Sequence, residues 1–140
     1  MRTNLYHTET KRIAAQQGAL LDKSRSRLHA THHLPLLEQN GVLHGLQVLI
    51  ENAIGKAMQQ LKVGDEVVPI SAYDVFTALA RIGLFSWEKL PEWYGIVSRR
   101  NRIAHDYMNA DTDQILHLAS QVRYALPLDF LMAPLNNETI

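Results

Sequence analysis

The longest regular pattern of hydrophobic positions in the chain runs from Leu36 to Leu61. Apolar residues return there at steps of three and four, which places them on one face of an α-helix. They are Leu36, Leu43, Leu46, Ile50, Ala53, Ile54, Ala57, Met58 and Leu61. The pattern predicts a long core helix that ends in a turn over residues 62–66. Each of its glycines Gly41, Gly45 and Gly55 costs roughly 1 kcal/mol relative to alanine, so we expect a neighbouring helix to pack closely there.

The first thirty residues carry a weaker pattern, with sparse apolar positions among polar and charged ones. These positions are Ile13, Ala14, Leu20, Leu21 and Leu28. They predict a helix from about Thr8 to Arg27 with a weak amphipathic stripe. A connection is expected over residues 29–35, because Pro35 disfavours helical geometry at the residue before it.

A third helix is predicted after Ser71, which is a good N-cap residue. Its inward face would consist of Val75, Leu79 and Ile82. Gly83 is suited to the end of that helix. Residues 67–70 are too short a run to count as a strand.

Two more helices complete the pattern. One is expected from Ser86 to about residue 109, and Pro91 is tolerated in it if the helix begins later than Ser86. The last begins at a possible capping box, Asp111 and Gln114, and is broken or kinked at Pro127. Its apolar stripe is Ile115, Leu118, Val122 and Leu126. The sequence therefore predicts an all-α fold, an up-and-down bundle of about five helices in a single domain over residues 1–140, with a polar tail from residue 134.

Composition narrows the class of protein further. Hydrophobic residues make up 46% and charged residues 20% of the 140 positions, as is usual for a globular domain, and the formal net charge is zero. Any site for an anion must then be a local patch, not a global positive field. There is no cysteine, which excludes disulfides and thiolate chemistry. No signal peptide and no membrane-spanning run is present in the sequence, so we expect a cytoplasmic protein. There is also no glycine-rich phosphate loop, and we expect no cofactor.

One residue breaks the hydrophobic pattern of the fourth helix. Its apolar side consists of Leu90, Trp93, Ile96, Val97, Ile103, Ala104 and Tyr107. Arg100 falls in the middle of that side, seven residues after Trp93 and seven before Tyr107. A guanidinium keeps its charge, and burying it without a partner costs several kcal/mol. Either a carboxylate pairs with Arg100, or the helix faces a groove that requires a fixed cation.

The second alternative gives Arg100 and His105 a chemical role. Their spacing by itself carries no weight, because Arg2/His7 and Arg27/His32 have the same spacing. Asn101 lies four residues before His105, where its amide can orient the imidazole. Such a histidine can exchange a proton with a 2′-hydroxyl or a leaving oxygen, and an arginine can stabilise a phosphorane-like transition state, so the pair suits RNA cleavage.

The geometry of a single helix limits this pair. Arg100 and His105 are about 140° apart around an ideal helix, so one copy cannot easily aim both at the same atom. A second copy related by a two-fold axis can supply the missing half, which predicts a homodimer with a shared cleft. The alternative is structural: an Arg100–carboxylate pair and a histidine with a satisfied core hydrogen bond.

The run from Arg100 to Tyr107, RNRIAHDY, resembles the R-x-x-x-x-H-x-Y motif of the HepT toxins, which belong to the HEPN superfamily of small helical domains. The resemblance extends from about Leu36 to Leu126 by the order of helices. It implies a metal-independent endoribonuclease that is active as a homodimer. Arg100 and His105 would be catalytic, with Asn101 as the supporting polar residue.

The resemblance also implies a partner. HepT toxins are usually encoded beside MntA, a minimal nucleotidyltransferase antitoxin that transfers AMP to the motif tyrosine, here Tyr107. The added phosphate would place negative charge and bulk beside Arg100 and silence the RNase. Two rival interpretations remain: a non-catalytic HEPN module that binds a nucleotide or a nucleotidyltransferase, and a plain interaction bundle in which Arg100 forms a buried salt bridge. The sequence does not distinguish tRNA from mRNA as the substrate.

The other candidate sites are weaker. Arg99 and Arg102 could contact RNA together with Trp93 and Tyr94, although Trp93 is better explained as core. The three histidines at positions 29, 32 and 33 have spacings compatible with a metal ion, but Pro35 and the lack of a nearby carboxylate favour a solvated loop. The acidic residues at 111 and 113 resemble a metal pair only superficially. We therefore predict no metal site.

Overall fold

Helices make up the regular structure of the computed structural model, which describes residues 2–31, 36–84, 86–106 and 125–133. Within these ranges there are five α-helices, one short 3₁₀ helix and no strand. The elements are α1 (Arg2–Thr31), α2 (Leu36–Val63), α3 (Ala72–Arg81), η1 (Trp87–Lys89), α4 (Leu90–Asp106) and α6 (Ala125–Met132). The predicted all-α bundle is confirmed. No helix in the described part of the chain is long and apolar enough to cross a membrane.

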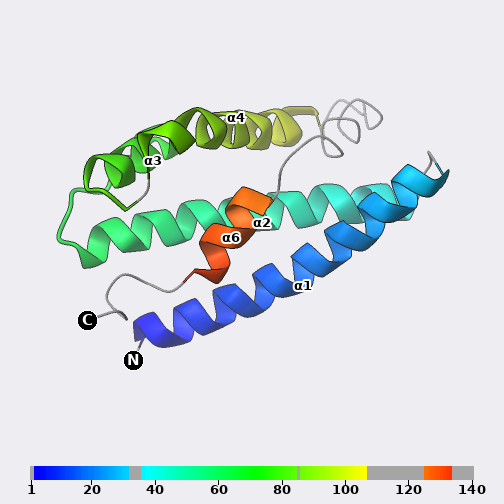
Figure 1. Ribbon diagram of the computed structural model, residues 1–140, viewed down its shortest axis with the longest axis horizontal. Coiled ribbons are helices and arrows are strands. Elements are labelled where there is room, and N and C mark those ends of the chain that lie inside the picture. The colour runs from blue at the N-terminus through cyan, green and yellow to red at the C-terminus, as the bar shows by residue number, and fades with distance from the viewer. Residues whose placement is uncertain (1, 32–35, 85, 107–124, 134–140) are drawn as a thin grey trace.

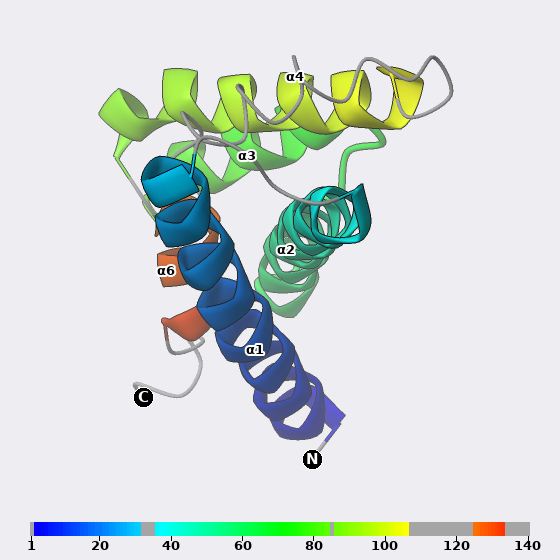
Figure 2. The ribbon, with the colours of Figure 1, turned by 90° about the vertical axis from the view of Figure 1, so that its right-hand side faces the viewer.

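Helix α2 is the centre of the molecule. Figure 1 shows it between α1 on one side and the α3–α4 pair on the other, and Figure 2 shows α1 and α2 side by side below α3 and α4. Helix α2 contacts α1, α3, α4 and α6. Its predicted inward face is buried at Leu43, Leu46, Ile50, Ala53, Ile54, Ala57 and Leu61. Met58 was expected on the same face but is 40% exposed, and Leu49 is fully buried instead. The helical periodicity therefore predicted the direction of the buried face correctly, but it misassigned residues at the edges of that face.

The three glycines of α2 differ in their surroundings. A Cβ at Gly45 would lie 2.8 Å from Gln17 Oε1 and 3.5 Å from Leu21 Cδ2, so the predicted close approach of a neighbouring helix, α1, is confirmed there. At Gly55 the near atom is the hydroxyl oxygen of Tyr6, at 3.0 Å. At Gly41 no atom of the described residues lies within 4 Å of a Cβ, so the expected close packing is not found there.

Helix α1 is longer than its weak pattern predicted. It extends from Arg2 to Thr31, so residues 29–31, which were expected in the connection, are helical. Residues 32–35, including His32, His33 and Pro35, lie outside the described residues. Because α1 packs along α2, tertiary contact stabilises turns that local propensity alone would leave marginal.

Helices α3 and α4 are joined to the rest of the core by aromatic side chains. The rings of Phe76 and Trp93 are stacked with centroids 4.3 Å apart, and Phe130 of α6 packs edge-on against Trp93 at 5.4 Å. Trp93 is 2% exposed, which confirms that it is a core residue. This excludes Trp93 from any RNA-contacting surface.

The observed ends of α3 and α4 differ from the prediction in their capping residues and in where α4 begins. Ser71 is the N-cap of α3, but its side chain makes no capping hydrogen bond, and Ile82 is 39% exposed because it is the C-cap residue. Gly83 has φ +83°, as its place after the helix requires.

Ser86 caps η1 by accepting a hydrogen bond from Glu88 N. Helix α4 thus begins at Leu90, and Pro91 lies in its first turn, where a proline is tolerated.

The last described helix is held by a buried lysine. Lys56 of α2 is 1% exposed, and its Nζ donates to the carbonyl oxygens of Phe130 and Ala133, each at 2.6 Å. These carbonyls belong to the C-terminal end of α6, where helix oxygens lack intrahelical partners and carry partial negative charge. Pro127 is buried in the first turn of α6, within a helix that continues to Met132. The predicted capping box and stripe at residues 111–122, and the tail from residue 134, lie outside the described residues.

Candidate active site on helix α4

The anomalous arginine lies where the buried face of α4 reaches solvent. Leu90, Trp93, Ile96 and Val97 are all buried, as predicted. Arg100 continues this face by one turn, and 24% of its side chain is exposed. The guanidinium is therefore neither fully buried nor free in water. A cation in this position retains much of its electrostatic strength.

The strongest contacts of Arg100 are with its neighbour in sequence. The side-chain oxygen of Asn101 accepts hydrogen bonds from Arg100 Nε at 3.0 Å and Nη2 at 2.7 Å. Both bonds lie on one edge of the planar guanidinium, which fixes its plane and direction. Asn101 was expected to orient His105, but its oxygen is engaged by Arg100. Only its amide NH₂ group is left for the imidazole.

Arg100 also meets a carboxylate, as the first alternative required. Glu51 of α2 places Oε1 3.3 Å from Arg100 Nη1, and 50% of its side chain is exposed. Charge-assisted hydrogen bonds are usually shorter, at about 2.7–2.9 Å. The contact is long and involves a single pair of atoms, so it does not lock Arg100 in a buried salt bridge. The interpretation as a plain interaction bundle predicted a buried salt bridge at Arg100. The structure places a carboxylate near Arg100, but the pair is not buried.

The guanidinium retains unused hydrogen-bonding capacity. An arginine has five N–H groups, and the contacts with Asn101 and Glu51 use three of them. Within the described part of the chain, the second N–H of Nη1 and that of Nη2 make no hydrogen bond. Nη1 and Nη2 form the end of the guanidinium fork, and that end can donate two parallel hydrogen bonds to a phosphate or carboxylate.

A surface hollow adjoins this arginine. It has a volume of about 340 Å³ and is lined by His44, Gln47, Val48, Glu51 and Asn52, which share one side of α2. Glu51 belongs to the hollow and also contacts Arg100, so the two features are continuous. Sequence reasoning missed the hollow, because nothing in the pattern of α2 indicates which part of its polar side faces α4.

The remaining predicted site residues are described to different extents. Arg99 is half-buried on α4. The structure describes the helical backbone of Arg102 and His105 but not their side chains, and Tyr107 lies outside the described residues. Because α4 is helical through Asp106, Arg100 and His105 are separated by about 7.5 Å along the axis and about 140° around it. The hydroxyl of Tyr94 is hydrogen-bonded to Thr77 at 2.5 Å, which ties it to α3.

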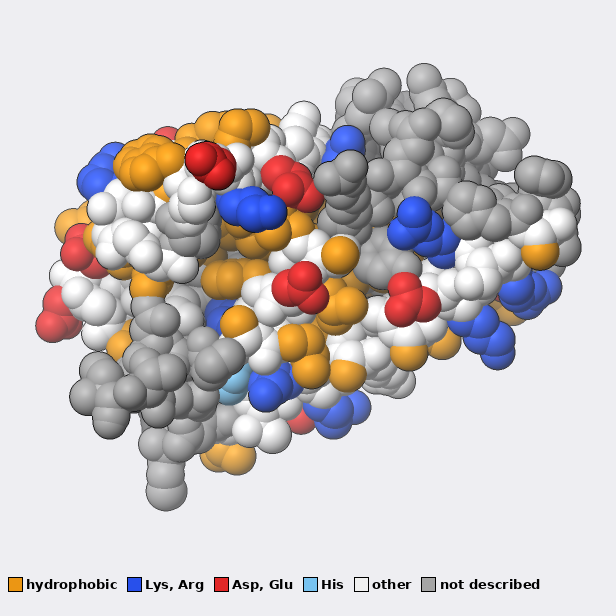
Figure 3. All heavy atoms as spheres, viewed as in Figure 1, with side chains coloured by type: hydrophobic (Ala, Val, Ile, Leu, Met, Phe, Trp, Pro, Cys, Tyr) orange, Lys and Arg blue, Asp and Glu red, His pale blue; other side chains and the backbone are white. Residues whose placement is uncertain are grey.

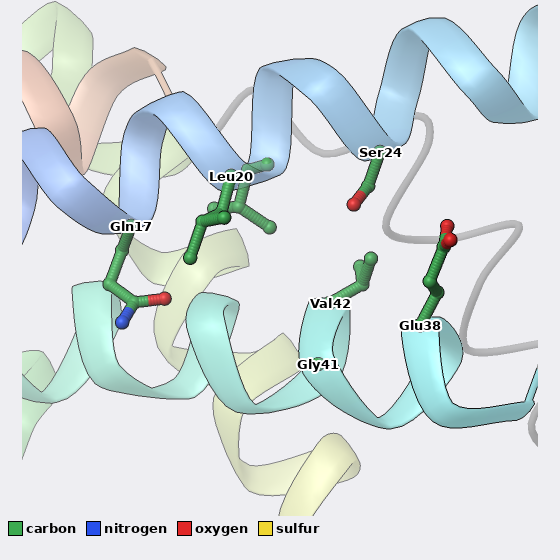
Figure 4. Close-up of a pocket in the computed structure, with 7 residues that line it drawn as sticks. Gln17, Leu20, Ser24, Glu38, Gly41 and Val42 are labelled. Atoms are coloured by element: carbon green, nitrogen blue, oxygen red, sulfur yellow. The ribbon is translucent and has the colours of Figure 1, made fainter.

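A second hollow lies between α1 and α2 and was not predicted. Figure 4 shows side chains from both helices pointing into it, and its volume is about 180 Å³. Its lining is Gln17, Leu20, Leu21, Ser24, Glu38, Gly41 and Val42. Arg27 donates to the carboxylate of Glu38. The walls are mostly apolar, and although Ser24 and Glu38 both line them, Glu38 Oε1 binds Arg27 and Oε2 has no hydrogen-bond partner among the described residues. Ser24 is therefore not activated by this carboxylate.

No metal centre emerges from the described residues, among which no three His, Asp or Glu side chains are grouped to hold an ion. His29 is helical in backbone, but its side chain is not described. The acidic residues 111 and 113 lie outside the described ranges. Figure 3 shows basic and acidic side chains interspersed over one face, in keeping with the zero net charge. This mixture is consistent with the expectation that any anion site is a local patch.

The fold and the site define a small helical bundle that presents an oriented, half-buried arginine near the end of a helix. The family model described as Ribonuclease HepT-like matches residues 22–127, and the chain therefore belongs to the HepT-like ribonuclease family. This confirms the family resemblance of the motif on α4. The matched range includes α2, α3 and α4, and thus Arg100, Asn101 and Glu51.

One solved structure that resembles this chain is described as "Crystal structure of the toxin-antitoxin with AMP-PNP". The match has a TM-score of 0.59 at 20% sequence identity, and it covers 85% of this chain and 97% of the other. At that identity the likeness shows a shared fold and nothing finer. No curated protein matches the chain.

Proposed function

We propose that this chain is a metal-independent endoribonuclease, the toxin of a toxin–antitoxin pair, and that it acts as a homodimer in the cytoplasm. The observation that carries the proposal is Arg100, which donates two hydrogen bonds to the side-chain oxygen of Asn101 and keeps one N–H on each of Nη1 and Nη2 for a further acceptor. A fixed, half-buried cation suits a phosphate whose charge grows in the transition state. Membership of the HepT-like ribonuclease family supports RNA as the substrate class.

The chemistry follows from the residue types. The 2′-oxygen of a ribose attacks the adjacent phosphorus, and the bond from phosphorus to the 5′-oxygen of the next nucleotide breaks. His105 takes the proton from the 2′-hydroxyl or gives one to the departing 5′-oxygen. Arg100 stabilises the additional negative charge on the phosphoryl oxygens. Arg99 and Arg102 bind neighbouring phosphates and position the RNA.

The dimer follows from helix geometry. Arg100 and His105 diverge by about 140° on α4, so a single copy cannot easily direct both at one phosphate. Two copies of α4 related by a two-fold axis bring Arg100 of one chain toward His105 of the other. A protein that is monomeric in solution would contradict this part of the proposal.

The proposed antitoxin is an MntA-like minimal nucleotidyltransferase that transfers AMP to Tyr107. The similar solved structure is described as a toxin–antitoxin with AMP-PNP, and an adenine nucleotide in that assembly supports this chemistry. Tyr107 is two positions after His105, so a phosphodiester on the tyrosine adds negative charge near the proposed RNA phosphate site. An intact-mass increase of one AMP after co-expression with the antitoxin, absent from Tyr107→Phe, tests this step.

The test of the nuclease uses unmodified protein, total RNA and excess EDTA. We expect cleavage that the chelator leaves unchanged and that Arg100→Ala or His105→Ala abolishes. Arg81→Ala is the matched control, because it removes an exposed arginine at the end of α3. Circular dichroism checks that each variant is folded. If folded, unmodified dimer leaves RNA intact, the chain is instead a non-catalytic HEPN module, whose binding to a nucleotidyltransferase or nucleotide would survive His105→Ala.

A further inference from the structure

The contact between Glu51 and Arg100 joins two helices and has no place in the proposed reaction. Glu51 Oε1 lies 3.3 Å from Arg100 Nη1, although the two residues are 49 positions apart in sequence. We propose that Glu51 is a displaceable counter-ion, which covers Arg100 in the free protein and competes with the RNA phosphate for it. The inference rests on the proposed function, since it assigns a residue that limits substrate binding at that site.

The geometry of the contact between Glu51 and Arg100 indicates that a phosphate can displace it. It is longer than an ordinary charge-assisted hydrogen bond and joins one oxygen to one nitrogen. Half of the Glu51 side chain is exposed, so water competes for the carboxylate at all times. Asn101, in contrast, accepts two hydrogen bonds along one edge of the guanidinium, one of them at 2.7 Å. Asn101 therefore holds the arginine, and Glu51 only covers it.

Displacement of Glu51 exposes a complete binding edge. Nη1 then has two free N–H groups and Nη2 has one, while Asn101 keeps Nε and the other N–H of Nη2. Nη1 and Nη2 together form the end of the fork, which can donate two parallel hydrogen bonds to a phosphate. The hollow of about 340 Å³ beside Glu51 gives its carboxylate room to turn away.

The expected consequence is on binding and not on the chemical step. A negative charge beside Arg100 lowers the local positive potential, and this matters in a chain whose net charge is zero. Once the phosphate is seated, Glu51 no longer touches the guanidinium and has no role in the transition state. Removing its charge should lower KM and leave kcat unchanged.

The test compares wild type with Glu51→Gln, which keeps the size of the side chain and removes its charge. The matched control is Glu66→Gln. Glu66 is exposed and lies beyond the C-terminal end of α2, and that end is about 18 Å along the helix axis from Glu51. The binding probe is a fluorescent 2′-O-methyl RNA oligomer, which lacks the nucleophilic hydroxyl. For Glu51→Gln we expect Kd and KM to fall about three- to five-fold at low salt, converging with wild type at high salt, with kcat within about two-fold. Glu66→Gln should match wild type.

Two results obtained with RNA would overturn the proposal. One is a fall in kcat at unchanged KM in Glu51→Gln, which would make Glu51 a positioning residue for Arg100. The other is an unchanged Kd for the oligomer.

A separate readout does not depend on RNA: the rate at which phenylglyoxal modifies Arg100, followed by peptide mass spectrometry. We expect a faster rate in Glu51→Gln, and an equal rate would count against the counter-ion role. If wild type cleaves no RNA, the proposed function fails, whereas this modification rate still decides whether Glu51 covers Arg100.

Discussion

The side-chain oxygen of Asn101 accepts two hydrogen bonds from Arg100, at 3.0 Å from Nε and 2.7 Å from Nη2. Adjacent residues on a helix point in directions about 100° apart, so such a pair forms only when both side chains bend toward one another. The contact fixes the guanidinium plane before any substrate arrives. It explains why a short polar residue directly after the arginine suits this site.

Replacing Asn101 should therefore impair the chemical step. For Asn101→Ala we expect a roughly ten- to hundred-fold loss of kcat, because Arg100 loses the contact that orients it. Asn101→Asp keeps an acceptor in place and should retain more of kcat, but its charge competes with phosphate and should raise KM. Steady-state cleavage of a labelled RNA measures both constants. Wild-type kcat in Asn101→Ala would refute the orienting role.

Lys56 should be a major contributor to stability. Lys56→Met preserves most of the side-chain volume but removes two charge-assisted hydrogen bonds to the end of α6, and should lower the free energy of unfolding by about 2–4 kcal/mol. Hydrogen exchange should increase most over residues 125–133. Lys62→Met, on an exposed position of the same helix, should change stability by less than about 0.5 kcal/mol. Equal denaturation midpoints for the two variants would disprove this role.

Two helical glycines should respond differently to alanine. No atom in the described part of the chain lies within 4 Å of a Cβ at Gly41, so Gly41→Ala should stabilise the protein by about 0.5–1 kcal/mol through helix propensity. A Cβ at Gly18 would lie 2.9 Å from Leu128 Cδ2, so Gly18→Ala must shift α6 or the leucine side chain and should gain less or destabilise. Urea denaturation gives both values. A larger gain at Gly18 than at Gly41 would show that the packing of α1 against α6 is looser than described.

Trp93 should act through the core and not through RNA. Its stacking on Phe76 at 4.3 Å means that Trp93→Ala opens a cavity and should cost about 3–5 kcal/mol, a large fraction of the stability of a small domain. Trp93→Phe should cost less and leave the Kd for a 2′-O-methyl RNA oligomer unchanged. A selective loss of RNA affinity in stable Trp93→Phe would assign this residue to the binding surface instead.

Much of the fold followed from periodicity. The long run of apolar positions in α2 identified the central helix, and the spacing of Leu90, Trp93 and Val97 identified the buried face of α4. Errors came where local signals were weak. Helix α1 exceeded its predicted ends because packing on α2 supports its outer turns, and Met58 was placed inside because periodicity does not define the width of the buried face.

The sequence by itself determined the helical class, the central helix and the anomaly of an arginine on an apolar face, because each depends on residues close together along the chain. Only the tertiary structure decided what meets that arginine. Glu51 lies 49 residues from Arg100, and the carbonyl of Phe130 lies 74 residues from Lys56. A hydrophobic stripe specifies which face of a helix is buried, but the rotation and crossing of packed helices decide which polar side chains come within hydrogen-bond distance.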